Sequence, residues 1–150
     1  MFAFLGPLYL MAVAWPLVRT DVREHRLPNR LVLPAIPVAM VGQCLEAAIT
    51  GEWARLGQAV GAAAFAFLLT ASISFAGALG MGDAKLIAAI SLSLGWFSPM
   101  AAALAVGVAM TAALVPALRL VKSETRLKSK LPLGPYLLVG FAVALALQFY

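Results

Sequence analysis

Apolar residues dominate the chain in long runs that short polar segments separate. Six such runs cover residues 2–18, 31–49, 57–79, 84–97, 99–121 and 131–149. A helix needs roughly 20 mostly apolar residues to cross a bilayer, so the pattern predicts about six transmembrane helices. The fourth run is short, and it fits either a tilted span in a thin patch of bilayer or a re-entrant segment.

The composition favours a membrane protein over a soluble one. Hydrophobic residues make up 63% of the 150 residues and charged residues only 11%. A soluble domain is nearer half apolar and a quarter charged. We therefore expect an all-α, polytopic membrane protein, in which residues 1–150 form a single membrane-embedded domain.

The basic residues predict how the chain is oriented. Cytoplasmic loops collect Lys and Arg, and six spans place ten of the eleven basic residues on that side, with both termini on the non-cytoplasmic side. The net charge of +5 suits such loops and their contact with anionic lipids, so we expect membrane lipids as partners and no nucleic acid. The ten residues are Arg19, Arg23, Arg26, Arg30, Lys85, Arg119, Lys122, Arg126, Lys128 and Lys130.

Small residues recur at helical spacing in two places. Gly57, Gly61 and Ala64 form one series, and Gly77 and Gly80 form another. Small residues let membrane helices approach one another closely, so we expect these positions to serve helix packing.

Two acids lie near the ends of predicted spans. Asp21 follows the first apolar run, and Asp83 follows the third. The predicted topology places both near the cytoplasmic surface, where acids are costly and often functional. Each acid also has a structural interpretation: Asp83 as a helix N-cap, and Asp21 as a loop charge that Arg19 or Arg23 balances.

A pair of aspartates has a chemistry of its own. Two carboxyl groups in close contact do not easily ionise together, so one keeps a proton. The charged group can take a proton from water, and the protonated one can donate to a carbonyl oxygen or a leaving amine. Such a pair hydrolyses a peptide bond, and neither the single Cys44 nor the single His25 offers a metal site. We therefore expect no metal and no cofactor.

Gly80 and Gly82 precede Asp83 directly. Glycines permit tight turns and a close approach of the backbone, which would let the Asp83 helix start deep in the protein. A helix C-cap at Gly80 is an equally good interpretation.

The motifs around these acids resemble those of type IV prepilin peptidases, which are membrane aspartic peptidases with a G-x-G-D signature. The resemblance covers essentially the whole chain. It rests on Gly80-Met81-Gly82-Asp83 with Lys85, on Asp21 six residues before Leu27-Pro28-Asn29, and on the P-x-G-P segment Pro132-Leu133-Gly134-Pro135.

The resemblance implies that Asp21 and Asp83 are the catalytic pair of an aspartic endopeptidase at the cytoplasmic face of the inner membrane. Its substrate would be the helix of a type IV prepilin or pseudopilin, from which it removes the leader, and the pilus assembly machinery would be a further partner. The only cysteine is Cys44, whereas the larger, methylating members carry paired cysteines. The chain therefore resembles the short form of Flp/Tad pilus systems, and we expect no N-methyltransferase activity. The implied supporting residues are Gly80, Gly82, Lys85, Pro28, Asn29, Gly134 and Pro135.

The residue types alone leave alternatives for these supporting positions. Asn29 favours helix capping over a role beside the aspartates, and Pro28 favours a structural role at the loop end. Lys85 suits either the carboxylates or lipid phosphate. Gly134 and Pro135 suit either a backbone break near the aspartates or a simple helix start.

Two other functions fit the acids. Intramembrane acids also serve proton relays, so a small proton-coupled transporter or channel subunit is the alternative to a peptidase. A non-catalytic assembly protein is the third interpretation, and in it both aspartates would be replaceable without loss of function.

Overall fold

The computed structural model describes residues 1–24, 27–75, 79–122 and 132–149. Several residues that the sequence analysis names lie outside this part of the chain, and they are His25, Arg26, Gly77, Arg126, Lys128 and Lys130.

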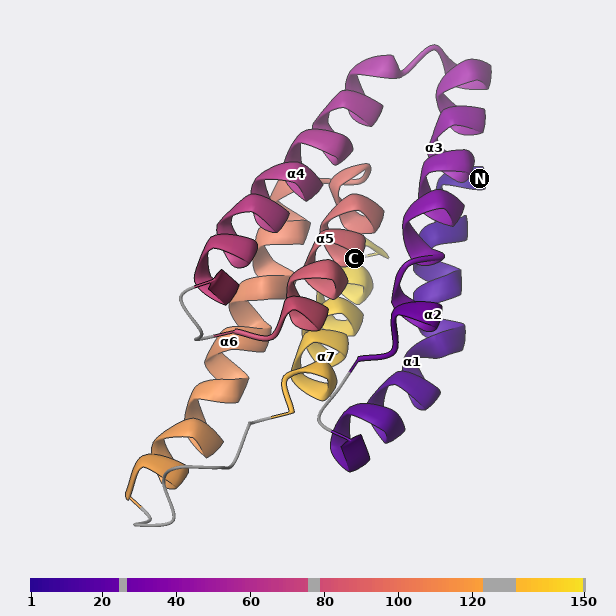
Figure 1. Cartoon of the computed structure of the whole chain (residues 1–150). Coiled ribbons are helices and arrows are strands. Elements are labelled where there is room, and N and C mark those ends of the chain that lie inside the picture. The colour runs from indigo at the N-terminus through magenta and orange to yellow at the C-terminus, as the bar shows by residue number, and fades with distance from the viewer. Residues whose placement is uncertain (25–26, 76–78, 123–131, 150) are drawn as a thin grey trace.

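Every regular element in the described residues is helical, which confirms the all-α prediction (Figure 1). A short 3-10 turn, η1 (Phe2–Phe4), leads into the first helix, and a second, η2 (Leu147–Phe149), follows the last. The helices are α1 (Leu5–Glu24), α2 (Asn29–Val32), α3 (Ala35–Thr50), α4 (Trp53–Phe75), α5 (Met81–Gly95), α6 (Pro99–Lys122) and α7 (Gly134–Ala146).

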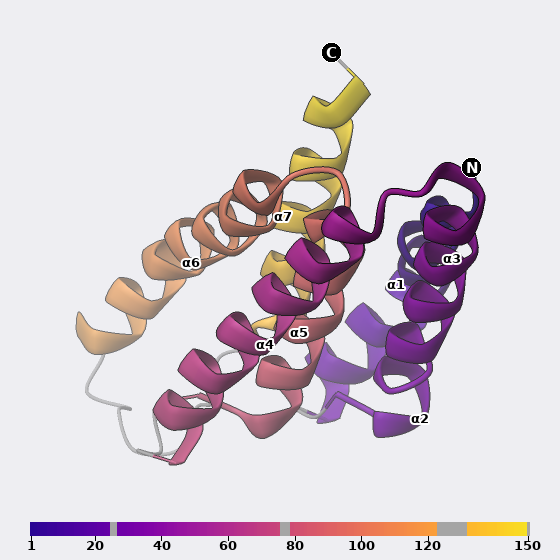
Figure 2. The same cartoon turned by 90° about the horizontal axis from the view of Figure 1, so that it is seen from above.

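The six long helices alternate in direction along the chain, with α2 and α3 together following the second apolar run (Figure 1). Pro34 separates α2 from α3, because proline lacks the amide that a continuous helix needs. Because the helices alternate in direction, the end of α1 and the starts of α2, α5 and α7 lie toward one end of the bundle. Both chain ends lie toward the other end (Figure 2).

Helix α5 is the centre of the bundle. It packs against α1, α3, α4, α6 and α7, and every residue from Leu86 to Gly95 is buried. The main core combines this helix with apolar side chains of the others, such as Leu10, Leu17 and Phe141. The apolar run of α5 is therefore enclosed by protein, and its packing on several sides fixes the position of the residues at its start.

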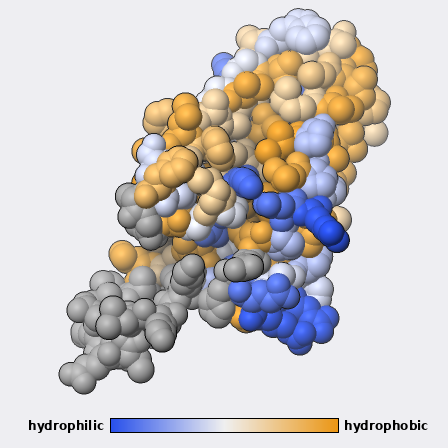
Figure 3. All heavy atoms as spheres, in the orientation of Figure 1, coloured by the Kyte–Doolittle hydropathy of each residue, from blue (hydrophilic) through white to orange (hydrophobic). Residues whose placement is uncertain are grey.

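Three stretches are long and apolar enough to cross a membrane: Phe2–Glu24, Asn29–Thr50 and Trp53–Phe75. Two shorter apolar helices follow at Pro99–Leu114 and Gly134–Ala146. Large apolar side chains such as Trp15, Phe65 and Leu68 are exposed on the outside. In Figure 3 the hydrophilic surface gathers over the end of α1 and around α2, and hydrophobic surface covers most of the rest.

Two sequence expectations are corrected by the helix boundaries and the packing. Asp21 was expected in a connection but lies inside a helix, because α1 continues six residues beyond the apolar run that ends at Val18. Lys85 was also expected at a connection and lies inside a helix, because α5 begins at Met81. A Cβ atom added at Gly57 or Gly61 would meet nothing within 4 Å. These two glycines therefore do not serve close packing between helices of this chain.

Candidate active site

Asp21 is a buried carboxylate in the last two turns of α1. Its exposed fraction is 4%, although it lies among the exposed residues Arg19, Val22 and Arg23. Its Oδ2 atom accepts a buried hydrogen bond of 2.8 Å from the backbone amide of Gly134. Asp21 thus faces the interior of the bundle, and the loop-charge interpretation is wrong.

Gly134 is the first residue of α7, and Pro135 follows it in the first turn. The amides of a helix's first turn have no partner within the helix, so this amide is available to Asp21. A Cβ atom at Gly134 would lie 2.7 Å from Asp21 Oδ2 and 3.2 Å from Leu27 Cδ2. Glycine is therefore required for this contact. The two interpretations of Gly134, a helix start and a backbone segment near the aspartates, both hold.

Asp83 lies in the first turn of α5, and Gly80 is the N-cap residue. The Asp83 carboxylate folds back to the backbone of Gly80, whose amide hydrogen-bonds to it. A Cβ atom at Gly80 would lie 2.7 Å from Asp83 Oδ2. Gly80 has φ −74°, so this glycine serves close approach and not a left-handed turn. Because it begins α5, the C-cap interpretation of Gly80 is wrong, as is that of Asp83 as the N-cap residue.

Leu27 lies between the two aspartate-bearing segments. A Cβ atom at Gly82 would lie 3.1 Å from Leu27 Cβ, and Leu27 Cδ2 is the atom that crowds Gly134. Leu27 thus contacts the start of α5 and the start of α7 at once. Leu27 was predicted only as part of a motif, and its place directly before Pro28 is the signal in the sequence for this contact.

The two aspartates are close enough to interact electrostatically. Asp83 lies directly before the predicted fourth span, 84–97. Burial raises the pKa of its carboxyl group from 3.8 to about 6. The charge of Asp21 is the second cause of this rise, and the hydrogen bond from the Gly80 backbone opposes it. A carboxyl with this pKa is far more often protonated near neutral pH than an ordinary aspartate.

Asn29 and Lys85 join α2 to α5. Lys85 Nζ donates a hydrogen bond of 3.1 Å to Asn29 Oδ1 at an exposed position. The N-cap of α2 is Pro28, and no side chain caps that helix, so the capping interpretation of Asn29 is wrong. This bond ties the segment that carries Leu27 to the helix that carries Asp83.

The three motifs therefore meet at one end of the bundle. The Asp21 and Leu27 segment contacts both the G-x-G-D segment and the start of α7, although these segments are far apart in the sequence. Among the described residues there is no group of three or more His, Cys, Asp or Glu side chains that could hold a metal ion.

An all-helical chain with three helices long and apolar enough to cross a membrane is typical of a membrane protein. Residues 8–115 match the model of the Type IV leader peptidase family. The chain belongs to this family, and membership supports a protease. The match includes both aspartates but not Gly134. Neither the curated proteins nor the solved structures contain a significant match.

Proposed function

We propose that the protein is a membrane aspartic endopeptidase that removes the leader peptide from type IV, Flp-like prepilins or pseudopilins. Asp21 and Asp83 are its catalytic pair, and residues 1–150 act as one membrane-embedded peptidase domain without N-methyltransferase activity. The supporting residues are Gly80, Gly82, Lys85, Pro28, Asn29, Gly134 and Pro135.

The proposal includes a topology. Six spans cross the inner membrane, both termini lie on the non-cytoplasmic side, and the aspartates act at the cytoplasmic face. The alternating helix directions support this arrangement, as does the exposure of Arg19, Arg23 and Arg30 near the aspartate end. Basic residues favour the cytoplasmic side.

The two aspartates have different roles in the proposed reaction. Asp21 is the base: it takes a proton from a water molecule while the water oxygen attacks the carbonyl carbon of the scissile peptide. Asp83 is the acid: it donates its proton to the carbonyl oxygen, which gives a tetrahedral diol. The proton on Asp21 then passes to the amide nitrogen, the C–N bond breaks, and Asp83 recovers a proton from the diol.

One observation carries this proposal: a single buried carboxylate, Asp21, is held by the Gly134 amide and also raises the pKa of Asp83. The Gly134 amide donates a hydrogen bond to Asp21 Oδ2, which fixes this carboxyl group in position. Burial favours the protonated form of Asp83. We therefore assign Asp83 as the acid, which leaves Asp21 as the base.

The test is to co-express the protein with a prepilin and to follow leader removal by gel shift and mass spectrometry. We expect Asp21→Asn and Asp83→Asn to leave the prepilin unprocessed. Glu24→Gln is the matched control, because Glu24 is an exposed acid one turn from Asp21, and we expect normal processing. Complete leader removal by either aspartate variant would overturn the assignment.

A further inference from the structure

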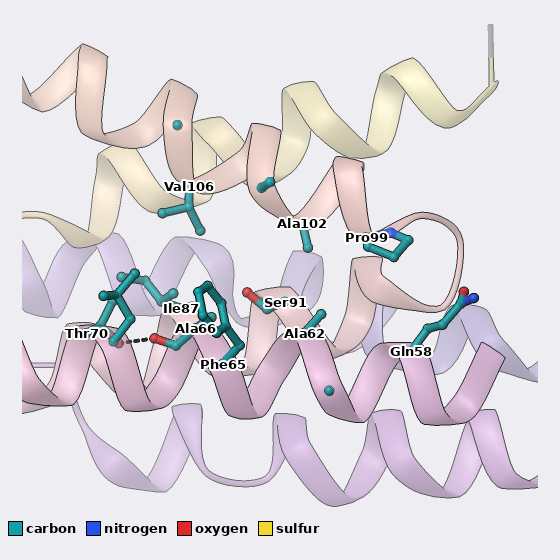
Figure 4. A pocket seen from close by; sticks show the side chains of 14 residues that line it. Gln58, Ala62, Phe65, Ala66, Thr70, Ile87, Ser91, Pro99, Ala102 and Val106 are labelled. Carbon is teal, nitrogen blue, oxygen red and sulfur yellow. Dashed lines mark hydrogen bonds between the residues drawn. The ribbon is translucent and has the colours of Figure 1, made fainter. Parts of the chain in front are cut away.

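A groove runs along the bundle between α4 and α6, and α5 forms its floor (Figure 4). Its volume is about 610 Å³. The floor residues Ile87 and Ser91 are buried, whereas the rim residues Phe65 and Gly107 are exposed. The groove is therefore open sideways, toward the lipid in a membrane-embedded chain.

The groove has the length of several helical turns. Its wall on α4 extends from Gln58 to Thr70, which corresponds to about 18 Å at 1.5 Å per residue. Its wall on α6 begins at Pro99 and reaches Gly107. A groove with these proportions fits one face of a helix.

Two glycines on the rim are not needed by the fold. A Cβ atom at Gly61 or Gly107 would meet nothing within 4 Å. By contrast, a Cβ atom at Gly95 would lie 2.9 Å from the Ala59 backbone, and one at Gly140 would collide with the Ala105 carbonyl. Glycine thus serves packing within the chain at Gly95 and Gly140, while Gly61 and Gly107 leave space that this chain does not fill.

The walls also carry small residues at the spacing that favours close helix contact. Ala62 and Ala66 are four residues apart on α4, and Ala103 and Gly107 are four apart on α6. Pairs of small residues at this spacing let membrane helices approach closely.

Ser91 is a polar side chain in the floor of this apolar groove. It is 2% exposed, and its hydroxyl points into the space between α4 and α6 (Figure 4). Thr70 donates its hydroxyl to the Ala66 carbonyl, and the hydroxyl of Ser91 adds a second polar group to the lining of the groove.

The floor of the groove and the candidate active site share helix α5. Asp83, Ile87 and Ser91 follow one another at intervals of four residues, so they lie along one side of α5. Ile87 stands about 6 Å from Asp83 along the helix axis. The Thr70 end of the groove is the end nearer Asp83, because α4 runs toward the aspartate end and α5 runs away from it.

We propose that the groove between α4 and α6 binds the apolar helix of the substrate and places the peptide bond before that helix beside Asp83. This inference rests on the proposed peptidase function, since it names where the helix of that substrate lies. A helix that enters sideways from the bilayer fills the space at Gly61 and Gly107, and its cleavage site extends toward the aspartates.

The test uses the full chain in phospholipid vesicles and two synthetic peptides. One has a basic leader, a glycine and an apolar helix of about 20 residues; the other ends shortly after the cleavage site. Gly61→Leu fills the groove, and Gly57→Leu is the matched control, because Gly57 is on the same helix, faces open space and does not line the groove.

We expect Gly61→Leu to raise KM for the helix-bearing peptide about tenfold, because the added side chain overpacks the groove. Cleavage of the short peptide and both activities of Gly57→Leu should equal those of the unmodified protein. Equal KM values for Gly61→Leu and Gly57→Leu on the helix-bearing peptide would overturn the groove proposal and leave the peptidase standing. Failure of the unmodified protein to cleave either peptide would overturn both.

Cross-linking identifies the occupant without relying on catalysis. In a Cys44→Ser, Asp83→Asn background, Ala103→Cys should form a disulfide with a cysteine in the apolar helix of the peptide, and Gly57→Cys should not. A disulfide-linked dimer of the protein through Ala103→Cys, or equal peptide cross-linking at both positions, would overturn the proposal.

Discussion

The contact between Gly134 and Asp21 gives a sharp prediction. In Gly134→Ala, the new Cβ would lie 2.7 Å from Asp21 Oδ2, whereas ordinary contact begins at 3.4 Å. The carboxylate would have to move by about 0.7 Å. It is 4% exposed, so it has little room to move, and the movement weakens its 2.8 Å hydrogen bond to the Gly134 amide.

The size of the effect follows from the loss of that bond. Hydrogen bonds to charged groups contribute about 1.5–3 kcal/mol, which corresponds to about 10- to 150-fold in rate. A misplacement of a reacting group by about 1 Å has a similar effect. We therefore expect kcat for leader removal to fall by about 10- to 150-fold in Gly134→Ala, with little change in KM.

The assay compares three glycine variants by peptide cleavage and by thermal unfolding in detergent. Gly57→Ala faces open space and should match the unmodified protein in both. Gly140→Ala collides with the Ala105 carbonyl, away from the aspartates, and should lower the melting temperature together with activity. Gly134→Ala should lose activity at a nearly unchanged melting temperature. Full activity in Gly134→Ala would refute the role of this contact.

Two further predictions concern pH and the bond between α2 and α5. Asp83 must be protonated to act as the acid, and burial raises its pKa to about 6. We therefore expect kcat/KM to fall as pH rises through about 6. A pH profile of kcat/KM that is flat from about 5 to about 9 would contradict this prediction. Since the folded pKa is raised, the same group lowers stability as pH rises from about 4 to about 6, which thermal unfolding at several pH values measures. Lys85→Met removes the 3.1 Å bond to Asn29; because the bond is exposed, we expect activity to fall no more than about fivefold, with the same loss in Asn29→Ala and no further loss in the double variant. Additive losses would show that the two side chains act separately.

Much of the fold follows from the apolar pattern, because each run long enough to span a bilayer has no stable alternative to a helix. The helix ends follow less well. The apolar run ends at Val18 but α1 continues to Glu24, since hydropathy marks where lipid contact ends and says nothing about backbone hydrogen bonds. The prediction that Asp21 lies near Asp83 agrees with the structure, but the kind of segment predicted for Asp21 was wrong.

The contacts between residues of the candidate site could not be predicted from the sequence. Asn29 has the residue type of a helix cap, but its partner Lys85 is 56 positions away, and Gly134 is 113 positions from Asp21. Pairings over such distances depend on how the helices pack around α5. The small residues on α4 are a second example. Their spacing indicates a surface for close helix contact, but it does not show whether that surface faces the interior of the protein. Gly61 lines a groove, and a Cβ atom there would meet nothing within 4 Å.

The central claim is that Asp21 and Asp83 act as one catalytic unit. Its most direct test is the cleavage rate of a leader-bearing peptide by purified Asp21→Asn, Asp83→Asn and the double variant, all shown to fold by thermal unfolding. Residues that act as a unit lose their effect together, so we predict that each single variant is as inactive as the double variant. A single variant that keeps a substantial rate, with a further drop in the double variant, would contradict the account.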